Sequence, residues 1–256
     1  MNDVTILVSF GADAVTSINT KNGIVVIDAG ISTYLTKKYR KIIAQEFNNQ
    51  KFIYLINTHS HHYHNRGNSV FDEAKIIGHV NGFDEIEKQW NNPKEFIDRT
   101  NKTVKEYDSN LQKQIKYSKE WIESFTQKIR YKSARNDAEN LIPIRKPDVT
   151  FHDSLVINVG DIRFEMKYFG GCHSNSDILI FVPQLNLLFT GDLMFQYGKP
   201  SIVSNTLINK ELWKTSIRWI QKRMNEKTVI IGGHGQLLSF EDLTSFNKQI
   251  LQKTHI

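Results

Sequence analysis

The sequence predicts an α/β fold, a layered sandwich in which helices cover two β-rich halves. Short apolar runs rich in Val, Ile, Leu and Phe recur in both halves of the chain, and each half also holds segments with helical periodicity. A sheet with an apolar face needs a covering layer, which the helical segments can supply. The chain has 256 residues, 39% of them hydrophobic, and this length can bury a substantial core within one domain.

The first third of the chain predicts strands on both sides of one helix. Asn22-Gly23 is typical of a hairpin turn. Ser32 or Thr33 can cap the helix, which then runs through Tyr39 and Phe47. The predicted strands are Val4–Phe10, Ala14–Thr20, Ile24–Ile27, Phe52–Ile56 and Lys75–Gly78.

The second half repeats this alternation of strands and helices. Its apolar runs are again short, and turn residues separate them. The predicted strands are Leu155–Val159, Ile162–Tyr168, Asp177–Val182, Leu187–Thr190 and Thr228–Ile231, and the predicted helices are Lys210–Met224 and Phe240–Lys253.

Between the two halves, residues from about 91 to 140 are predicted to form a helical insertion. Apolar residues from Ile97 to Ile129 recur at helical spacing among Lys, Glu and Gln, which predicts one long amphipathic helix or a helical pair. Packing of this apolar stripe on the core is the simplest role. A lid over an active site and a homodimer surface are the alternatives. We expect a single domain, residues 1–256, that carries the insertion.

Composition narrows the classes of function. The formal net charge is +6 and the pI is about 9.2, but the lysines are spread along the chain, so no nucleic-acid site is expected. No apolar run approaches the roughly 18 residues that span a bilayer. The N-terminus lacks a signal-peptide pattern, which slightly favours the cytoplasm and leaves open an exported, mature form. A single cysteine, Cys172, excludes an internal disulfide.

Histidines gather on the segment that follows the predicted strand Phe52–Ile56. His59, His61, His62 and His64 lie within six residues. His59 and His61, two residues apart in an extended loop, project to the same side and can share one metal ion. His64, three residues after His61, can face a second metal ion, whereas His62 is expected to point away.

Further candidate ligands lie at the ends of later strands. His173 follows a Gly-Gly turn between two predicted strands and can supply a third nitrogen. Asp192 and His234 each follow a predicted strand and offer a carboxylate and an imidazole. These are ligand types that zinc prefers, and catalytic zinc sites leave one position to water. Cys172, beside His173, is expected to be a small buried thiol and not a ligand.

These motifs resemble those of the metallo-β-lactamase superfamily. The family motif His-x-His-x-Asp-His, followed shortly by Gly, aligns with residues 59–67, and Asp28 matches an aspartate that braces the metal loop. The resemblance covers nearly the whole chain apart from the helical insertion. It implies an αββα four-layer sandwich with metal ions at one edge between the sheets. The implied metal ligands are His59, His61, His64, His173, Asp192 as the bridging aspartate, and His234.

Tyr63 stands where the family motif has its aspartate, which in the family binds the second metal ion and orients the attacking water. A phenol has a pKa near 10 and is therefore a poor ligand at neutral pH. Three outcomes remain open. The second site holds its metal ion more weakly; Tyr63 adapts as a ligand or as a donor to an oxyanion; or catalysis has been lost.

The resemblance predicts a zinc-dependent hydrolase in which metal-bound hydroxide attacks an ester, lactone, amide or related bond of a small-molecule substrate. One or two zinc ions are expected, with iron and manganese as alternatives, and Tyr63 and Asp192 are the expected catalytic residues. The second hypothesis is a catalytically impaired pseudoenzyme that binds a metal ion or a ligand. The helical insertion and the segment from Phe195 to Pro200 are the expected walls of the substrate pocket.

Overall fold

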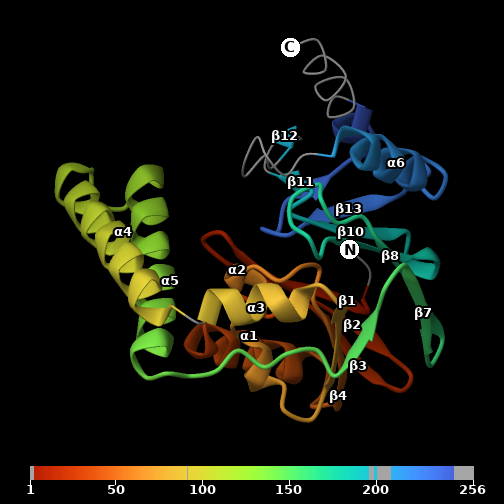
Figure 1. Cartoon of the computed structure of the whole chain (residues 1–256), viewed down its shortest axis with the longest axis horizontal. Helices are drawn as coiled ribbons and strands as arrows, with labels where there is room; N and C mark the ends of the chain where they lie inside the picture. The colour runs from red at the N-terminus through yellow and green to blue at the C-terminus, as the bar shows by residue number, and fades with distance from the viewer. Residues whose placement is uncertain (1–2, 91, 196–198, 201–208, 245–256) are drawn as a thin grey trace.

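The predicted α/β sandwich is confirmed by the computed structural model, which describes residues 3–90, 92–195, 199–200 and 209–244. Two six-stranded sheets pack face to face, and helices cover their outer faces (Figure 1). None of the described helices is both long and apolar enough to cross a bilayer.

The first sheet has the strand order β1-β2-β3-β4-β5-β6. β1 to β3 pair antiparallel, and β3 to β6 pair parallel. The hairpin between β2 and β3 turns one residue earlier than predicted, because Thr20 pairs with Gly23 and leaves Lys21-Asn22 as the turn. The strands are β1 (Thr5–Phe10), β2 (Asp13–Thr20), β3 (Gly23–Ile27), β4 (Phe52–Ile56), β5 (Lys75–His79) and β6 (Val149–Phe151).

The second sheet has the order β14-β13-β10-β9-β8-β7. β10 and β13 run parallel, and the other neighbours run antiparallel. The strands are β7 (Ser154–Val159), β8 (Ile162–Tyr168), β9 (Ile178–Val182), β10 (Leu187–Gly191), β13 (Val229–Gly232) and β14 (Leu237–Leu238), with β11 (Met194–Phe195) and β12 (Lys199–Pro200) as a separate small hairpin.

Three apolar clusters define four layers. One fills the space between the sheets, one lies between the first sheet and helix α1 (Thr33–Glu46), and one lies between the second sheet and helix α6 (Lys210–Gln221). Each fully buried aliphatic side chain contributes about 1.5–3 kcal/mol to stability. The apolar cluster between the two sheets is centred on Ile18, Val25, Ile56, Phe164, Ile180 and Phe189.

The segment predicted as a helical insertion forms two helices, α4 (Pro93–Lys113) and α5 (Lys119–Glu139), here called the helical pair. The pair stands beside the two sheets at the left of Figure 1. Its apolar stripe divides. Val104 is buried, and Ile97 and Ile129 pack partly buried against the apolar cluster beneath the first sheet, whereas Ile115 is 83% exposed and Ile122 is 50% exposed. The expectation that the whole stripe packs on the core is therefore wrong for the tip, which extends past the layer beneath it.

Buried polar contacts fix the base of the helical pair to the first sheet. Arg130 of α5 forms an ion pair with Asp13 of β2, with Arg130 Nη2 2.8 Å from Asp13 Oδ1 and side chains only 3% and 0% exposed. Asp13 Oδ2 also accepts hydrogen bonds from Tyr39 Oη and from the backbone N–H of Ile31. Asp137 of α5 accepts two hydrogen bonds from Thr33 at the start of α1.

Among the short elements that were not predicted from the sequence are β6, β14 and helix α3 (Gly82–Trp90). β6 has three residues and β14 has two, too few to show a period. The predicted helix Phe240–Lys253 is helical from Phe240 to residue 244, and its remainder lies outside the described residues.

Candidate metal centre

The predicted ligand residues follow strands that end at one edge of the sandwich. The first histidine loop, residues 57–68, follows β4 and includes the short helix α2 (His62–Asn65). The second histidine loop, residues 169–177, joins β8 to β9 and carries His173. Asp192 follows β10 and His234 follows β13, two parallel neighbours whose carboxyl ends meet at the same edge.

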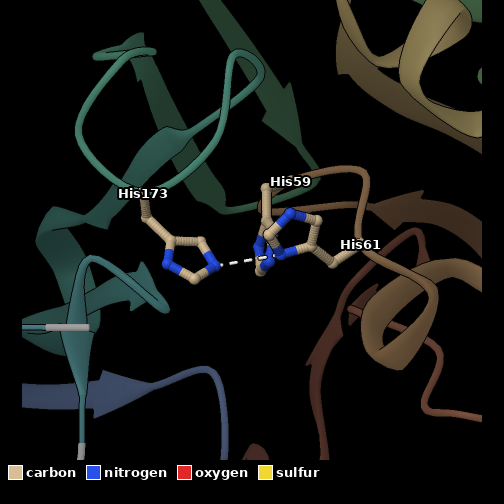
Figure 2. Close-up of side chains that lie close together, drawn as sticks. All are labelled: His59, His61 and His173. Atoms are coloured by element: carbon tan, nitrogen blue, oxygen red, sulfur yellow. Dashed lines mark hydrogen bonds between the residues drawn. The ribbon is translucent and has the colours of Figure 1, made fainter. Parts of the chain in front are cut away.

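His59, His61 and His173 form the first cluster, here called the three-histidine group. One ring nitrogen from each lies within 4.8 Å of the others. His61 Nδ1 and His173 Nε2 are 3.0 Å apart, and Figure 2 shows the three rings turned toward one point from two sides. Two imidazole nitrogens at that separation share either one proton or one cation. The arrangement therefore suits a metal ion bound by three nitrogens.

His59, His64 and Asp192 form the second cluster, here called the aspartate group. Asp192 Oδ1 lies 3.4 Å from His64 Nε2, and Asp192 Oδ2 lies 4.0 Å from His59 Nε2. Asp192 Oδ2 is also 3.2 Å from His234 Nε2 and 3.6 Å from His173 Nε2. Asp192 therefore belongs to the aspartate group and also faces His173 of the three-histidine group, so its one carboxylate can serve both groups.

Buried polar atoms in this centre fit a cation. His59 Nε2, His64 Nε2 and Asp192 Oδ1 are inaccessible to solvent and make no contact with hydrogen-bond geometry, although His64 Nε2 and Asp192 Oδ1 face each other as an ion pair at 3.4 Å. Buried polar atoms in proteins almost always have partners, and each exception calls for an explanation. Nitrogen and carboxylate donors that converge in this way are a donor set that zinc accepts.

Asp28 braces the first histidine loop from below. Its carboxylate accepts hydrogen bonds of 2.8 Å from both the backbone N–H and the hydroxyl of Thr58. Asp28 Oδ2 also lies 2.9 Å from His64 Nδ1, so His64 Nε2 is directed toward Asp192. A carboxylate behind a metal-binding imidazole fixes its orientation and its tautomer. The structure thus places Asp28 in the bracing position that the sequence resemblance implies.

Two further contacts close the first histidine loop at its base. The side-chain amides of Asn57 and Asn68 exchange hydrogen bonds of 3.0 and 2.8 Å. A Cβ atom added to Gly67 would lie 2.1 Å from both Ala29 O and Thr36 Oγ1, so only glycine fits there. These contacts limit the conformations that the loop can adopt.

Asp177 organises the second histidine loop, a role that the sequence did not reveal. Its carboxylate accepts hydrogen bonds from the backbone N–H groups of His173 and Ser174, each 2.7 Å, and from Ser174 Oγ at 2.6 Å. Burial raises the pKa of Asp177 to about 6. The sequence places Asp177 at the start of a strand, but β9 begins one residue later. The run of polar residues between the apolar strands β8 and β9 is the sequence signal that could have indicated this role.

Burial and charge set the protonation states of the cluster. Burial lowers the pKa of His59 well below its usual value and that of His61 to about 4. Both imidazoles are therefore neutral at pH 7, as metal ligands must be. Burial opposes ionisation of Asp192, but the nearby His64 and His234 lower its pKa well below the usual range. Burial also opposes charge on His64, yet Asp192 and Asp28 raise its pKa to about 10, so a metal ion bound at His64 would have to displace a proton.

Tyr63 directs its hydroxyl toward the helical pair. Its Oη lies 3.1 Å from Tyr131 Oη of α5, and its ring lies edge-on to His234 at 6.2 Å between centroids. Burial, together with Tyr131, raises the pKa of Tyr63 above its usual value. Tyr63 is therefore a neutral phenol at physiological pH.

A pocket of about 780 Å³ opens over the candidate metal centre. The helical pair forms the opposite wall, as the sequence predicts. The side chains of the other expected wall, Phe195 to Pro200, lie outside the described part of the structure. The lining includes His61, Tyr63, His173, Asp192 and His234 on one side and Arg99, Tyr107 and Tyr131 on the other.

Two neighbours of the predicted ligands lie apart from both groups. The His62 ring is buried between Tyr63 and Phe96, with centroid distances of 3.9 and 4.9 Å. The Cys172 side chain is buried among the apolar residues beneath α6. Among the residues that the structure describes, neither belongs to a metal-binding cluster.

A four-layer sandwich with buried imidazoles and a carboxylate at one edge defines a class of metal-binding α/β proteins. The family model described as the metallo-β-lactamase superfamily matches residues 12–234. The chain therefore belongs to this superfamily, whose members are mostly hydrolytic enzymes.

Individual relatives are distant. A metallo-β-lactamase type 2 from Bacteroides fragilis is 24% identical over 107 residues, which are 42% of this chain and 43% of that protein. The alignment thus spans less than half of the relative's length.

Solved structures share the fold at low identity. The sec-alkylsulfatase Pisa1 from Pseudomonas sp. superimposes with a TM-score of 0.69 at 16% identity, over 98% of this chain and 41% of that one. A metallo-β-lactamase from Pontibacter korlensis superimposes with a TM-score of 0.57 at 18% identity, over 97% of this chain and 93% of that one. These similarities show the fold alone.

Proposed function

We propose that the protein is a zinc-dependent hydrolase that cleaves an ester, lactone, amide or related bond in a small molecule. The observation that carries this proposal is the convergence of buried donor atoms, in which His59 Nε2 has no hydrogen-bond partner and lies 4.0 Å from Asp192 Oδ2, while His64 Nε2 faces Asp192 Oδ1 at 3.4 Å. The pocket of about 780 Å³ above them is large enough for a drug-sized molecule.

The donor set divides between two ions. The three-histidine group would hold the first, and His64, Asp192 and His234 would hold the second. Zinc bound in this way supplies a water whose pKa is lowered to about 7 and a positive charge beside the attacked bond.

The chain's own residues would orient the reactants. Asp192 is ionised and lies between the groups, so it can accept a hydrogen bond from the attacking water and orient it. Tyr63 lines the pocket as a neutral phenol and can donate a hydrogen bond to an oxygen that gains charge. The helical pair excludes bulk water from one side of the pocket, which strengthens both interactions.

The competing proposal is a pseudoenzyme that uses the same centre only to bind a metal ion or a ligand. Tyr63 favours it, because a neutral phenol stands where the family motif has its carboxylate. A pseudoenzyme that binds a metal ion would have the same metal content as the hydrolase, so a bound metal ion alone does not separate the two proposals.

The test combines metal analysis with a substrate panel. We expect the purified protein to contain zinc, iron or manganese, or to take up zinc on titration. The panel contains esters, lactones, a β-lactam, a sec-alkyl sulfate and a phosphodiester, and turnover should appear with at least one. His61→Ala should abolish that turnover, whereas His152→Ala, at an exposed histidine outside both groups, should not.

The outcomes separate the two functions. A protein that takes up no metal ion contradicts the hydrolase and leaves only a pseudoenzyme that binds a ligand without a metal ion. Metal binding without turnover on any member of the panel favours the pseudoenzyme, and turnover that survives His61→Ala overturns the assigned centre.

A further inference from the structure

Helix α3 lies against both histidine loops and brings one carboxylate between them. Glu85, in the first turn of α3, uses both of its oxygens. Glu85 Oε2 accepts hydrogen bonds from Ser60 Oγ and from Ser176 Oγ, the latter at 2.6 Å. Glu85 Oε1 accepts a hydrogen bond of 3.0 Å from the backbone N–H of Asn175. One side chain thus joins two segments that follow strands of different sheets.

The segments that Glu85 joins carry the three-histidine group. Ser60 lies between His59 and His61 in the sequence, and Asn175 and Ser176 come two and three residues after His173. The two loops also contact each other directly, because the backbone N–H of Ser60 donates to Ser176 Oγ at 3.0 Å.

The start of α3 fits closely over this junction. A Cβ atom built on Gly82 would lie 3.7 Å from the Cβ atoms of both Ser60 and Ser176. Asn81, just before the helix, donates a side-chain hydrogen bond of 3.1 Å to Asn175 O. The helix therefore contacts the junction through its backbone and through two side chains, and Glu85 supplies the only carboxylate among these contacts.

The separation of the two loops decides whether a metal ion can bind. His59 and His61 come from the first loop and His173 from the second, so the distance of 3.0 Å between His61 Nδ1 and His173 Nε2 spans the junction. Zinc–nitrogen bonds are about 2.0–2.1 Å long, and small displacements of one ligand weaken them. Hydrogen bonds to an ionised group are about twice as strong as neutral ones, which makes a carboxylate an effective link.

We infer that Glu85 is a positioning residue that holds the two histidine loops at the separation a zinc ion requires. It acts through Ser60 and Ser176 and is not itself a ligand. The inference rests on the proposed zinc site and adds to it a part of the chain that the metal motifs do not include.

The test measures zinc affinity by competition with a chromophoric chelator. Glu85→Gln should weaken the tightest zinc site by about 10–100-fold, the usual effect of losing a residue that orients metal ligands. Ser176→Ala removes one of the hydrogen bonds that Glu85 accepts and should weaken the affinity for zinc less than Glu85→Gln does. The matched control is Glu87→Gln on the same helix, where the carboxylate pairs with Lys146 at the surface, and it should leave the affinity unchanged.

Two further measurements separate positioning from a general loss of structure. The Glu85→Gln and Ser176→Ala double variant should lose less zinc affinity than the two single losses add up to, because both changes remove the hydrogen bond between Ser176 and Glu85, whereas only Ser176→Ala removes the contact with the backbone N–H of Ser60. Cobalt(II) in place of zinc should give an altered visible absorption spectrum in Glu85→Gln and not in Glu87→Gln, since the spectrum reports the ligand geometry.

Each result bears on a different statement. A wild-type protein that binds no zinc overturns the proposed function. A wild-type protein that binds zinc, with Glu85→Gln within twofold of it, overturns the role of Glu85 and leaves the function standing. If the losses of zinc affinity in the two single variants add up in full in the double variant, Glu85 does not act through Ser176.

Discussion

The two candidate metal groups are held together by different forces. The aspartate group continues into a row of alternating carboxylates and imidazoles, Asp28, His64, Asp192 and His234, whose facing atoms are 2.9, 3.4 and 3.2 Å apart. The three-histidine group instead brings two imidazole nitrogens within 3.0 Å of each other, and burial keeps His59 and His61 neutral.

The two groups therefore depend on different interactions in order to form. Opposite charges on His64 and Asp192 draw these two residues together, so they are expected to pair before any metal ion binds. His59 and His61 are neutral and gain little from each other, so the three-histidine group depends on the loops that carry it. Changes of charge should therefore damage the aspartate group, and acid or loosened loops should damage the three-histidine group.

The largest effect is expected from Asp28→Asn, which breaks the aspartate group at its buried end. Asparagine tolerates the left-handed backbone of this position, where φ is 60°, so the change removes mainly the charge beside His64. Removal of one partner of a buried ion pair costs about 3–5 kcal/mol. Urea unfolding of chelator-treated protein measures this loss. Asp161→Asn, in an exposed pair with Lys21, is the control, and a loss below about 1 kcal/mol in Asp28→Asn would contradict the prediction.

Acid should act on the three-histidine group through His61. Its pKa is about 4 in the folded chain against 6.5 for a free histidine, so protonation favours the unfolded chain. The stability that neutral His61 contributes is complete above pH 6.5 and is lost as the pH falls toward 4. The loss amounts to about 3 kcal/mol. Unfolding of chelator-treated protein at each pH should therefore show a shallower decline in His61→Gln than in wild type, and equal slopes would contradict the prediction.

Restoration of the family carboxylate should strengthen the weaker metal site. We expect Tyr63→Asp to tighten binding of the second zinc ion by about tenfold, a typical effect of changing one residue close to a metal ion. Calorimetric titration of the first and second ions measures the change. Tyr63→Phe keeps the ring and adds no ligand, so it should leave the second affinity unaltered. The same result for Tyr63→Asp would show that Tyr63 is not the limiting residue.

The smallest effect is expected from Tyr131→Phe, which removes the hydroxyl that contacts Tyr63. Loss of one hydrogen bond between neutral groups costs about 1 kcal/mol. Thermal or urea unfolding detects that change, and Tyr117→Phe, at a side chain that is 69% exposed, is the control. A decrease of several kcal/mol in the free energy of unfolding would mean that the Tyr131 hydroxyl stabilises the fold through more than its hydrogen bond with Tyr63.

Much of the fold could be predicted from the sequence, because strands and helices leave local periods. Phe52–Ile56 and Ile162–Tyr168 have the bounds that the apolar runs predict. The histidines were also visible, since His59, His61 and His64 lie within one short segment. Their distant partners, His173, Asp192 and His234, were candidates because each follows a predicted strand, and the family resemblance joined them into one ligand set.

The supports of the metal centre could not be predicted, because they act between residues far apart in the chain. Glu85 is 25 residues from Ser60 and 91 from Ser176, and no pattern in the sequence links them. The Tyr63–Tyr131 contact spans 68 residues. Such contacts depend on how the sheets and the helical pair pack, which the periodicity of single segments does not encode.

The buried ion pair between Asp13 and Arg130 has a consequence for substrate entry. If the helical pair swung outward, Arg130 would leave with it and the buried carboxylate of Asp13 would lose its cationic partner, at a cost of several kcal/mol. The distance between Tyr131 and the histidines is therefore a fixed dimension of the molecule. For the proposed hydrolase, this distance would admit only substrates that fit the opening, so discrimination by size would take place at entry, before any bond is broken.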